Sequence, residues 1–334
     1  MSASLNGVQP TLSALLIDIS GTLLIGSAPT PGAARALARL RAARVPFRFC
    51  SNTSKESTQE ICRRLAELSM HVLPGEVWTS IGALKGVLRD TGVRRPAYLP
   101  YTLLSQSARA ECLGIDSGMT NHHSQDDTIE PYDAVVVGLA PSVFDYEHLN
   151  TAFRILVREH QNDKQLLEAS LSSPTSKPPL IALHKARYIQ AFDRALSLGP
   201  GPFVAALEEA SGTRALVVGK PTKLFFETVI KSFQGGNIGD GGGGRIAVIG
   251  DDVSADLGEG AIELGLWRVL VKTGKYRAGD ESREGAYPPD EVCESFADFV
   301  DRFLDQDRFL QSTFFNCSRD ETEVGAVGRG SPLE

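Results

Sequence analysis

Five short apolar runs recur along the chain, and polar residues follow each of them. The runs cover residues 14–19, 46–50, 215–218, 245–249 and 267–271. They show little alternation between apolar and polar positions, which is typical of strands whose two faces are both covered by helices. The pattern therefore predicts five strands of a parallel sheet.

Apolar residues at helical spacing lie between these runs. Thr53 with Glu56 predicts a capping box, and the helix that follows it extends to Leu68. Another helical pattern follows the fourth run, and Gly265 is placed to end it. Strands that alternate with helices in this way predict an α/β fold with a Rossmann-like parallel-sheet core.

The interval between Asn52 and Lys220 is far longer than a crossover helix requires. We therefore expect an inserted α/β cap domain at residues 82–199 and a discontinuous core formed by residues 1–81 and 200–310. The cap has its own predicted strands at residues 98–99, 134–138 and 181–183.

Four other segments predict loops or disorder. The glycine-rich segment 235–244 lacks the GxGxxG spacing after a strand, so we expect a flexible loop and no phosphate cradle. Ser170–Pro179 predicts a surface loop of the cap, and the tail at 311–334, where the apolar pattern fades, is expected to be disordered. A polar stretch without the spacing of metal ligands is also expected to be a loop; it carries His122, His123, Asp126 and Asp127.

The composition narrows the class of protein. The 334 residues favour two domains, and 42% hydrophobic with 22% charged residues are ordinary values for a globular protein. The net charge of -7 argues against a general nucleic-acid binder. Five cysteines without a CxxC spacing indicate neither a disulfide framework nor a zinc site. No apolar stretch approaches about 18 residues and the first residues do not resemble a signal peptide, so we expect a cytoplasmic protein without a membrane partner.

Polar side chains that could take part in catalysis or ligand binding follow four of the predicted strands. The runs end, in order, at Asp18, at Ser51-Asn52, at Gly219-Lys220 and at Asp251-Asp252. An aspartate in such a place can simply mark the end of a strand. Ligands of open parallel sheets, however, bind beyond the carboxyl ends of the strands, so four such ends can converge on one site.

These four runs, in this order, resemble the signature motifs of the haloacid dehalogenase superfamily of aspartate-nucleophile phosphatases. The resemblance covers nearly all of residues 12–300 and implies the family's large cap between the second and third motifs. It implies that Asp18 takes the phosphoryl group as an aspartyl-phosphate. It also implies a Mg²⁺ site formed by Asp18, the main-chain carbonyl of Ser20, and Asp251, since Mg²⁺ prefers carboxylates and other hard oxygen ligands.

The second and third motifs supply groups that would bind phosphate. Lys220 would offset the negative charge shared by Asp18 and the phosphoryl group. Ser51 and the main-chain amides of Asn52 and Thr53, just before a predicted helix, are expected to form an anion site at a helix N-terminus. The simpler alternative, a helix cap, accounts for Thr53 alone.

Further candidates surround this set. Asp256 is expected to orient the metal ligands from the next helix, and Asp252 either orients them or is a surface charge. In the cap, His184, Lys185 and Arg187 are candidates for substrate contacts, although a solvated charged face is an equally good interpretation of them.

Ser20 departs from the family pattern, in which a second aspartate at this position protonates the leaving group. A serine hydroxyl cannot replace that acid at neutral pH, so alkyl phosphates should be poor substrates. The expected partners are small phosphorylated molecules, pyrophosphate or phosphorylated side chains, whose leaving groups need less help. A weakly active or inactive protein that binds phospho-ligands is the alternative, and dehalogenation of small acids is a third, weaker hypothesis. The resemblance leaves open a homodimer through the cap.

Overall fold

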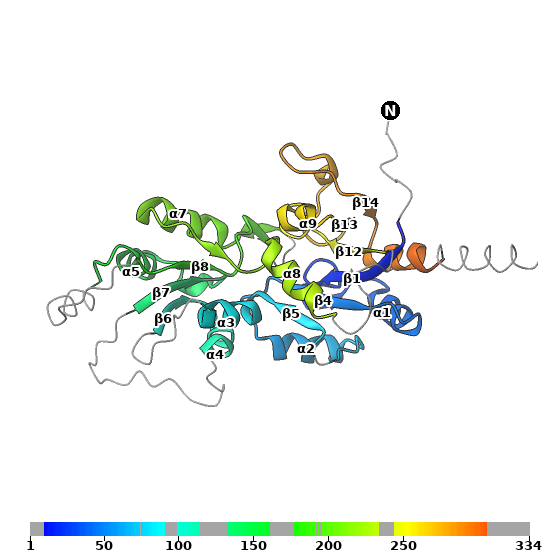
Figure 1. Cartoon of the computed structure of the whole chain (residues 1–334), viewed down its shortest axis with the longest axis horizontal. Coiled ribbons are helices and arrows are strands. Elements are labelled where there is room, and N and C mark those ends of the chain that lie inside the picture. The colour runs from blue at the N-terminus through cyan, green and yellow to red at the C-terminus, as the bar shows by residue number, and fades with distance from the viewer. Residues whose placement is uncertain are drawn as a thin grey trace, which may run out of the picture.

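The computed structural model consists of two α/β units, each built around its own parallel sheet (Figure 1). It describes residues 10–73, 75–90, 99–113, 132–160, 177–191, 193, 195–233 and 244–305. Several interpretations from the sequence fall outside these residues: those for 122–127, 170–176, 235–243 and 311–334.

The core unit contains a six-stranded sheet in which all neighbouring strands are parallel. Its strands, in spatial order, are β14 (Glu291–Cys293), β13 (Trp267–Val271), β12 (Arg245–Gly250), β1 (Leu12–Asp18), β4 (Phe47–Ser51) and β5 (Val77–Thr79). Four of the five predicted strands lie in this sheet, which confirms the parallel α/β core. At its centre Ile17 of β1 is opposite Ile249 of β12, so the carboxyl ends of these two strands are adjacent.

Helices cover both faces of the core sheet. One face packs against α1 (Ala33–Ala42), α2 (Thr58–Glu67) and the helical residues 296–305, and the other packs against α8 (Lys223–Lys231) and α9 (Glu259–Glu263). Leu15 and Ile17 of β1 lie in the first of these cores, and Ala14 and Leu16 lie in the second. Burial on both faces explains why the strands appear in the sequence as continuous apolar runs.

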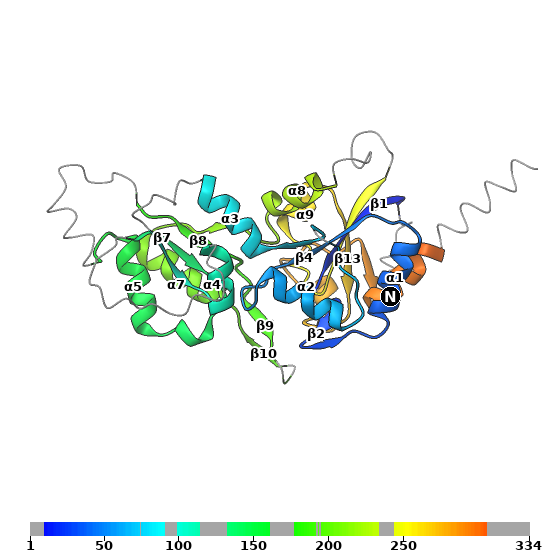
Figure 2. The ribbon, with the colours of Figure 1, turned by 90° about the horizontal axis from the view of Figure 1, so that it is seen from below.

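The second unit, residues 80–218, is called the inserted unit below. Its four-stranded parallel sheet has the order β11 (Leu216–Val217), β8 (Leu180–Ala182), β7 (Tyr132–Val137) and β6 (Leu99–Leu103). Among its described residues, the helices α3 (Ser80–Asp90) and α4 (Gln106–Leu113) lie on one face, with α5 (Tyr146–Leu156) and α7 (Gly201–Ser211) on the other. The shorter elements that the structure describes are the hairpins β2 (Leu24–Ile25) with β3 (Ala28–Pro29) and β9 (Tyr188–Gln190) with β10 (Leu196–Leu198), and the 3₁₀ helices η1 (Pro141–Val143) and η2 (Asp280–Ser282). The β9–β10 hairpin lies where the two units meet (Figure 2).

One strand and one boundary differ from the predictions. The run at 215–218 was expected in the core sheet, but β11 pairs with β8, where Leu216 is opposite Ile181. The return to the core was expected at residue 200, but Val204 and Leu207 of α7 pack into the inserted unit. The physical reason is that α7 is the crossover helix between two parallel strands, β8 and β11, and the apolar pattern does not tell which sheet receives the second strand.

The chain passes between the units at two places that lie side by side. It leaves the core after β5 and returns at Gly219. A Cβ on Gly219 would lie 2.4 Å from Asn52 Oδ1 and 2.9 Å from the Cβ of Ser80, so only glycine fits there. Ser80 Oγ also donates a hydrogen bond of 3.0 Å to the carbonyl of Thr53.

The starts of two helices also differ. Ser57 is the N-cap of α2, and its hydroxyl and the Glu60 carboxylate form the capping box, one turn later than predicted. The sequence offers the same Ser/Thr-x-x-Glu pattern twice, at Thr53 and at Ser57, so the pattern alone could not choose between them. After the fourth strand, turns precede the short α9, which ends before Gly265 as expected.

No helix in the part of the chain that the structure describes is long and apolar enough to cross a membrane. The cysteines in that part, Cys50, Cys62, Cys112 and Cys293, are all free thiols.

Candidate active site

Three buried carboxylates meet at the carboxyl end of the core sheet. Asp18 is the last residue of β1, Asp251 directly follows β12, and Asp256 lies in the turns after it. One oxygen from each of the three lies within 4.8 Å of the others, and each residue is at most 5% exposed. The structure therefore brings together the first and fourth motifs, as the strand ends predicted. Asp256 does not lie in a helix, contrary to the expectation.

Lys220 lies beneath these carboxylates and is 1% exposed. Its Nζ donates hydrogen bonds to Asp18 Oδ1 at 2.5 Å and to Asp256 Oδ1 at 2.8 Å. Burial acts to lower the pKa of Lys220, but the Asp18 and Asp256 carboxylates outweigh it and raise the pKa above its ordinary value. Lys220 therefore places a fixed positive charge beside the Asp18 carboxylate. It lies just after Gly219, where the chain returns from the inserted unit to the core.

The oxygens of these carboxylates differ in the hydrogen bonds that they accept. Asp256 uses both of its oxygens, because Oδ2 accepts a hydrogen bond of 3.1 Å from the amide of Asp252. Asp18 Oδ2 and Asp251 Oδ1 are buried and accept no hydrogen bond. Buried carboxylate oxygens are unfavourable without a partner, and hard oxygens of this kind suit Mg²⁺. The donor set thus fits a divalent cation between Asp18 and Asp251, with Asp256 holding Lys220 and the loop behind them.

Burial and mutual repulsion raise the pKa values of the Asp18 and Asp251 carboxyl groups. Burial, followed by the negative charge of Asp256, raises the pKa of Asp18 to about 6, and the nearby Lys220 opposes that shift. Burial also raises the pKa of Asp251 well above its usual range, while Lys275 opposes it. Carboxylates raised in this way gain from a cation that stabilises their charged forms.

Lys275 belongs to this site and was missed as a site residue. Its main-chain amide donates a 2.6 Å hydrogen bond to Asp251 Oδ2, and its Nζ lies 3.0 Å from Asp252 Oδ2. Asp252 Oδ1 accepts hydrogen bonds from the amides of Ser254 and Ala255, both at 2.9 Å. Asp252 therefore fixes Lys275 and the following turn and is not a surface charge. A signal was present, because Lys275 directly follows a glycine shortly after the fifth apolar run, and Lys220 likewise follows a glycine after the third.

Two glycines allow the loops around Asp251 to approach it closely. A Cβ on Gly21 would lie 1.9 Å from Asp251 Oδ2, and one on Gly274 would lie 2.1 Å from the same atom. Both residues also have positive φ angles, of 103° and 56°. Any other residue at either position would displace the carboxylate.

The second motif differs in detail from its prediction. Asn52 forms two hydrogen bonds with the main chain of Lys220: Nδ2 donates to the carbonyl at 2.9 Å, and Oδ1 accepts from the amide at 2.8 Å. The Thr53 amide donates to Ser51 Oγ at 3.3 Å. Because α2 begins only at Thr58, the expected helix N-terminus is not at Asn52 and Thr53. The side chain of Asn52 instead fixes the lysine of the third motif.

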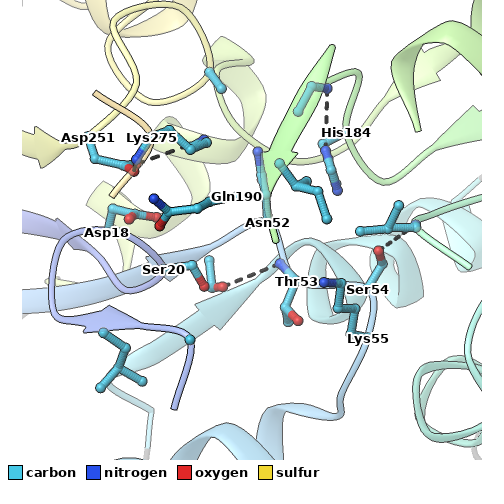
Figure 3. Close-up of a pocket in the computed structure, with 18 of the residues that line it drawn as sticks. Asp18, Ser20, Asn52, Thr53, Ser54, Lys55, His184, Gln190, Asp251 and Lys275 are labelled. Atoms are coloured by element: carbon cyan, nitrogen blue, oxygen red, sulfur yellow. Dashed lines mark hydrogen bonds and ion pairs between the residues drawn. The ribbon is translucent and has the colours of Figure 1, made fainter. Parts of the chain in front are cut away.

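A pocket of about 500 Å³ opens above the carboxylates, between the two units (Figure 3). We call its two sides the core wall and the inserted wall. The core wall includes Asp18, Ser20, Ser51, Asn52, Thr53, Asp251, Asp256 and Lys275. The inserted wall consists of Leu139, His184, Ala186, Ile189, Gln190 and Ala191. Ser20 is exposed to the pocket, where the family resemblance expects an acid.

The three basic candidates of the inserted unit differ in their placement. His184 lies in the pocket and is 5% exposed; burial, followed by the charges of Lys275 and Lys220, lowers its pKa to about 3. Its imidazole is therefore neutral at physiological pH. Lys185 and Arg187 are outside the lining, and Lys185 Nζ pairs with Glu208 Oε2 at 2.6 Å. Positive charge alone did not indicate which side chains face the pocket.

The rim of the pocket carries residues that sequence reasoning did not identify. Lys55 and Glu56 come from the loop before α2, and Arg64 Nη2 of α2 pairs with Glu56 Oε1 at 2.5 Å. Gln190 comes from β9 and reaches toward the Asp18 side of the pocket (Figure 3). Glu56 and Arg64 pair within the core, whereas Gln190 meets the core only through the packing of the two units, so no local sequence pattern marks Gln190.

Comparison with known proteins agrees with this geometry. The sequence profile of the haloacid dehalogenase-like hydrolases matches residues 15–116, and a HAD-hydrolase-like profile matches residues 217–299. The matched segments contain the strand ends that form the core wall. The chain belongs to the haloacid dehalogenase-like hydrolase family.

Similar proteins include two from Homo sapiens. Haloacid dehalogenase-like hydrolase domain-containing protein 2 is 42% identical over 294 residues, which cover 88% of this chain and 96% of that protein. Phospholysine phosphohistidine inorganic pyrophosphate phosphatase is 32% identical over 295 residues, covering 87% and 93%. The crystal structure of a 4-nitrophenylphosphatase from Thermotoga maritima shares the fold, with a TM-score of 0.65, 21% identity, and coverage of 87% and 97%.

Proposed function

We propose that this protein is a Mg²⁺-dependent phosphatase that transfers a phosphoryl group from a small phosphorylated molecule to Asp18 and then to water. The observation that carries the proposal is the pair of buried carboxylate oxygens without hydrogen-bond partners, Asp18 Oδ2 and Asp251 Oδ1, beside the fixed charge of Lys220. Such a set is unfavourable by itself and suited to a cation and a phosphoryl group. The phosphatase names of several relatives support the proposal.

The reaction has two steps. An oxygen of the Asp18 carboxylate attacks phosphorus, and the bond from phosphorus to the leaving group breaks, with the electron pair departing on the leaving group. Water then attacks the aspartyl-phosphate and loses a proton to solvent, which releases inorganic phosphate and restores the carboxylate. Lys220 holds Asp18 Oδ1 through its 2.5 Å hydrogen bond and offsets the negative charge that gathers around phosphorus.

Asp18, Asp251 and the main-chain carbonyl of Ser20 would hold Mg²⁺, which supplies charge neutralisation at the phosphoryl oxygens. The residues behind them keep these ligands in place: Asp256 positions Lys220, and Asp252 positions Lys275. The inserted unit acts as a cap that encloses the substrate and excludes water. His184 offers it a neutral hydrogen-bonding group, since its Nδ1 accepts from the amide of Ala186 at 3.4 Å and the proton is then on Nε2.

Ser20 restricts the substrates. Its hydroxyl faces the pocket but is too weak an acid to protonate an alkoxide leaving group. The leaving groups of pyrophosphate, of aryl phosphates and of protonated phosphoramidates, such as phosphorylated lysine and histidine side chains, depart without that proton. One relative carries phospholysine, phosphohistidine and pyrophosphate in its name, which supports this substrate class.

A second candidate function is binding of a phospho-ligand with negligible turnover, and Ser20 is the observation that favours it. The retained Asp18, Lys220 and Asp251 favour the enzyme, because binding alone does not require a nucleophilic Asp18 paired with the buried Lys220 ammonium group. Binding of a phospho-ligand without phosphorylation of the protein and without release of phosphate would support the binding protein.

The experiment that tests the enzyme is Mg²⁺-dependent phosphate release from pyrophosphate and an aryl phosphate by the wild type and by Asp18→Asn. The variant should lose turnover and keep its fold, because the amide keeps the shape without being an adequate nucleophile. Acid-quenched wild-type protein should carry one phosphoryl group by intact mass, and the variant none. Asp145→Asn is the matched control, since Asp145 caps α5 outside the pocket and asparagine caps helices equally well. Full activity of Asp18→Asn would overturn the mechanism.

A further inference from the structure

A single peptide group connects the inserted unit to the metal-site carboxylate Asp251. The peptide between Gly274 and Lys275 donates its N–H to Asp251 Oδ2 at 2.6 Å. Its carbonyl accepts a hydrogen bond of 2.7 Å from Nε2 of Gln190, a side chain of β9 in the inserted unit. The carbonyl also accepts from Arg277 Nη1 at 3.3 Å, a contact within the same loop. A peptide group is planar and rigid, so its two ends move together.

The loop that carries this peptide cannot adjust independently. Gly274 is packed so closely that an added Cβ would lie 2.4 Å from Gly21 Cα and 2.1 Å from Asp251 Oδ2. Thr273 Oγ1 donates a hydrogen bond of 2.5 Å to the carbonyl of Gly21 on the other side. A shift of the peptide therefore changes the position of the Asp251 carboxylate, because no free space separates them.

We propose that Gln190 is a positioning residue that couples the place of the inserted unit to the metal ligand Asp251 through the Gly274–Lys275 peptide. The inference rests on the Mg²⁺ site of the proposed function. Gln190 lines the pocket and donates its hydrogen bond to the Gly274 carbonyl, so the peptide is the path by which it would act on metal binding. Two hydrogen bonds in series through one amide also polarise each other. When the inserted unit moves away, Asp251 loses part of the support that orients it toward the cation.

The structure offers a matched control in the same hairpin. The hydroxyl of Tyr188, two residues before Gln190 on β9, accepts a hydrogen bond of 2.9 Å from Arg283 Nη1 of the core. Arg283 Nη2 donates to Ser254 Oγ at 2.7 Å, so this second contact ends in the turns after Asp251 and does not involve the Gly274–Lys275 peptide. Tyr188→Phe thus removes one hydrogen bond between the units and leaves the Gly274–Lys275 peptide untouched.

The experiment is titration of the full chain with Mg²⁺ by calorimetry, without substrate, for the wild type, Gln190→Met and Tyr188→Phe. Methionine keeps the length of glutamine without its donor. We expect Gln190→Met to weaken Mg²⁺ binding by about threefold to tenfold, the effect of one hydrogen bond, and Tyr188→Phe to change it less than twofold. Gln190→Asn, whose amide is too short to reach the carbonyl, is the second variant if methionine prevents folding.

Three results would overturn the inference. Unchanged or tighter Mg²⁺ binding by a folded Gln190 variant would show that the peptide transmits nothing. Equal weakening by Gln190→Met and Tyr188→Phe would mean that any loosening of the inserted unit acts on the metal. If the wild type itself does not bind Mg²⁺, the proposed function fails first and the coupling fails with it, so the two failures are distinct.

The coupling is reciprocal, which gives a readout independent of affinity. If the place of the inserted unit affects Mg²⁺ binding, Mg²⁺ must favour the docked position of the hairpin by the same factor. Amide hydrogen exchange in β9 and β10 should therefore slow on addition of Mg²⁺ in the wild type and in Tyr188→Phe, but not in Gln190→Met. Equal slowing in all three proteins would contradict the proposed path.

Discussion

The two walls of the pocket differ in chemistry. The core wall and the residues directly behind it hold four buried aspartates and two lysines in a network of short hydrogen bonds. The inserted wall is mainly apolar, and its one titratable residue, His184, is neutral. The charges of the pocket thus lie on one side, and in the proposed reaction they would stabilise the phosphoryl transfer while the other side would enclose the substrate and exclude water.

The largest effect that would test this division is expected in the core wall network. Lys220→Ala should lower turnover by about 10²–10³-fold, because a preorganised charge beside the nucleophile is lost. Phosphate release under saturating Mg²⁺, with thermal unfolding to verify the fold, is the measurement. Lys185→Ala is the control, since this lysine pairs with Glu208 away from the pocket. Equal losses in both variants would mean that the charges of the two units are not divided in this way.

A smaller effect is expected at Ser20, the position in the core wall that departs from the family pattern. Ser20→Asp should raise turnover of alkyl phosphates relative to aryl phosphates by at least about tenfold, because only the alkoxide needs the added proton. The ratio of the two rates cancels errors in active fraction and metal occupancy. An unchanged ratio in a folded variant that binds Mg²⁺ would show that another group supplies the proton or that chemistry does not limit the rate.

The smallest effect concerns the neutral histidine of the inserted wall. The pKa of His184 is lowered from 6.5 to about 3 in the folded protein, so the unfolded chain binds a proton first as the pH falls. Its contribution to stability is complete above pH 6.5 and is lost as the pH falls toward 3. Between pH 6.5 and 5.5 the wild type should lose about 1 kcal/mol of unfolding free energy that His184→Gln does not lose.

The measurement is the free energy of unfolding by denaturant at the two pH values for both proteins. Asp18 titrates in the same range with the opposite sign: its pKa is raised to about 6, so its contribution is lost as the pH rises. That term is common to both proteins and cancels in the difference. If both proteins show the same pH dependence, His184 is charged in the folded state and the inserted wall is not neutral.

The sequence predicted most of the core wall and little of the inserted wall, and the reason is local. Asp18 and Asp251 each follow a run of buried apolar residues, so their place at the sheet edge is determined by neighbours in the sequence. Gln190 meets Gly274 only because two units pack together, 84 residues apart along the chain. The hydrophobic periodicity of the sequence does not indicate such a contact. A homodimer through the inserted unit stays a prediction.

The errors have the same physical origin. β11 and the first turn of α2 were misplaced because two sheets, or two Ser/Thr-x-x-Glu patterns, could each accept the segment. Lys275 was missed although a glycine precedes it beyond a predicted strand, as a glycine precedes Lys220. Lys185 and Arg187 were chosen on charge, but the direction of a side chain depends on its partners, and Glu208 holds Lys185 away from the pocket.

The paired joints at Ser80 and Gly219 bear on how such proteins diversify. Because the inserted unit begins and ends at neighbouring points, it occupies a single gap in an otherwise continuous core, as a loop would. Recombination at these two points can exchange the whole block without altering the path of the core strands. Asn52 holds the main chain of Lys220 on the core side of the second joint, so the lysine stays with the core in any such exchange. Replacement of the block can thus change the inserted wall of the pocket, while Asp18, Lys220 and Asp251 stay on the core.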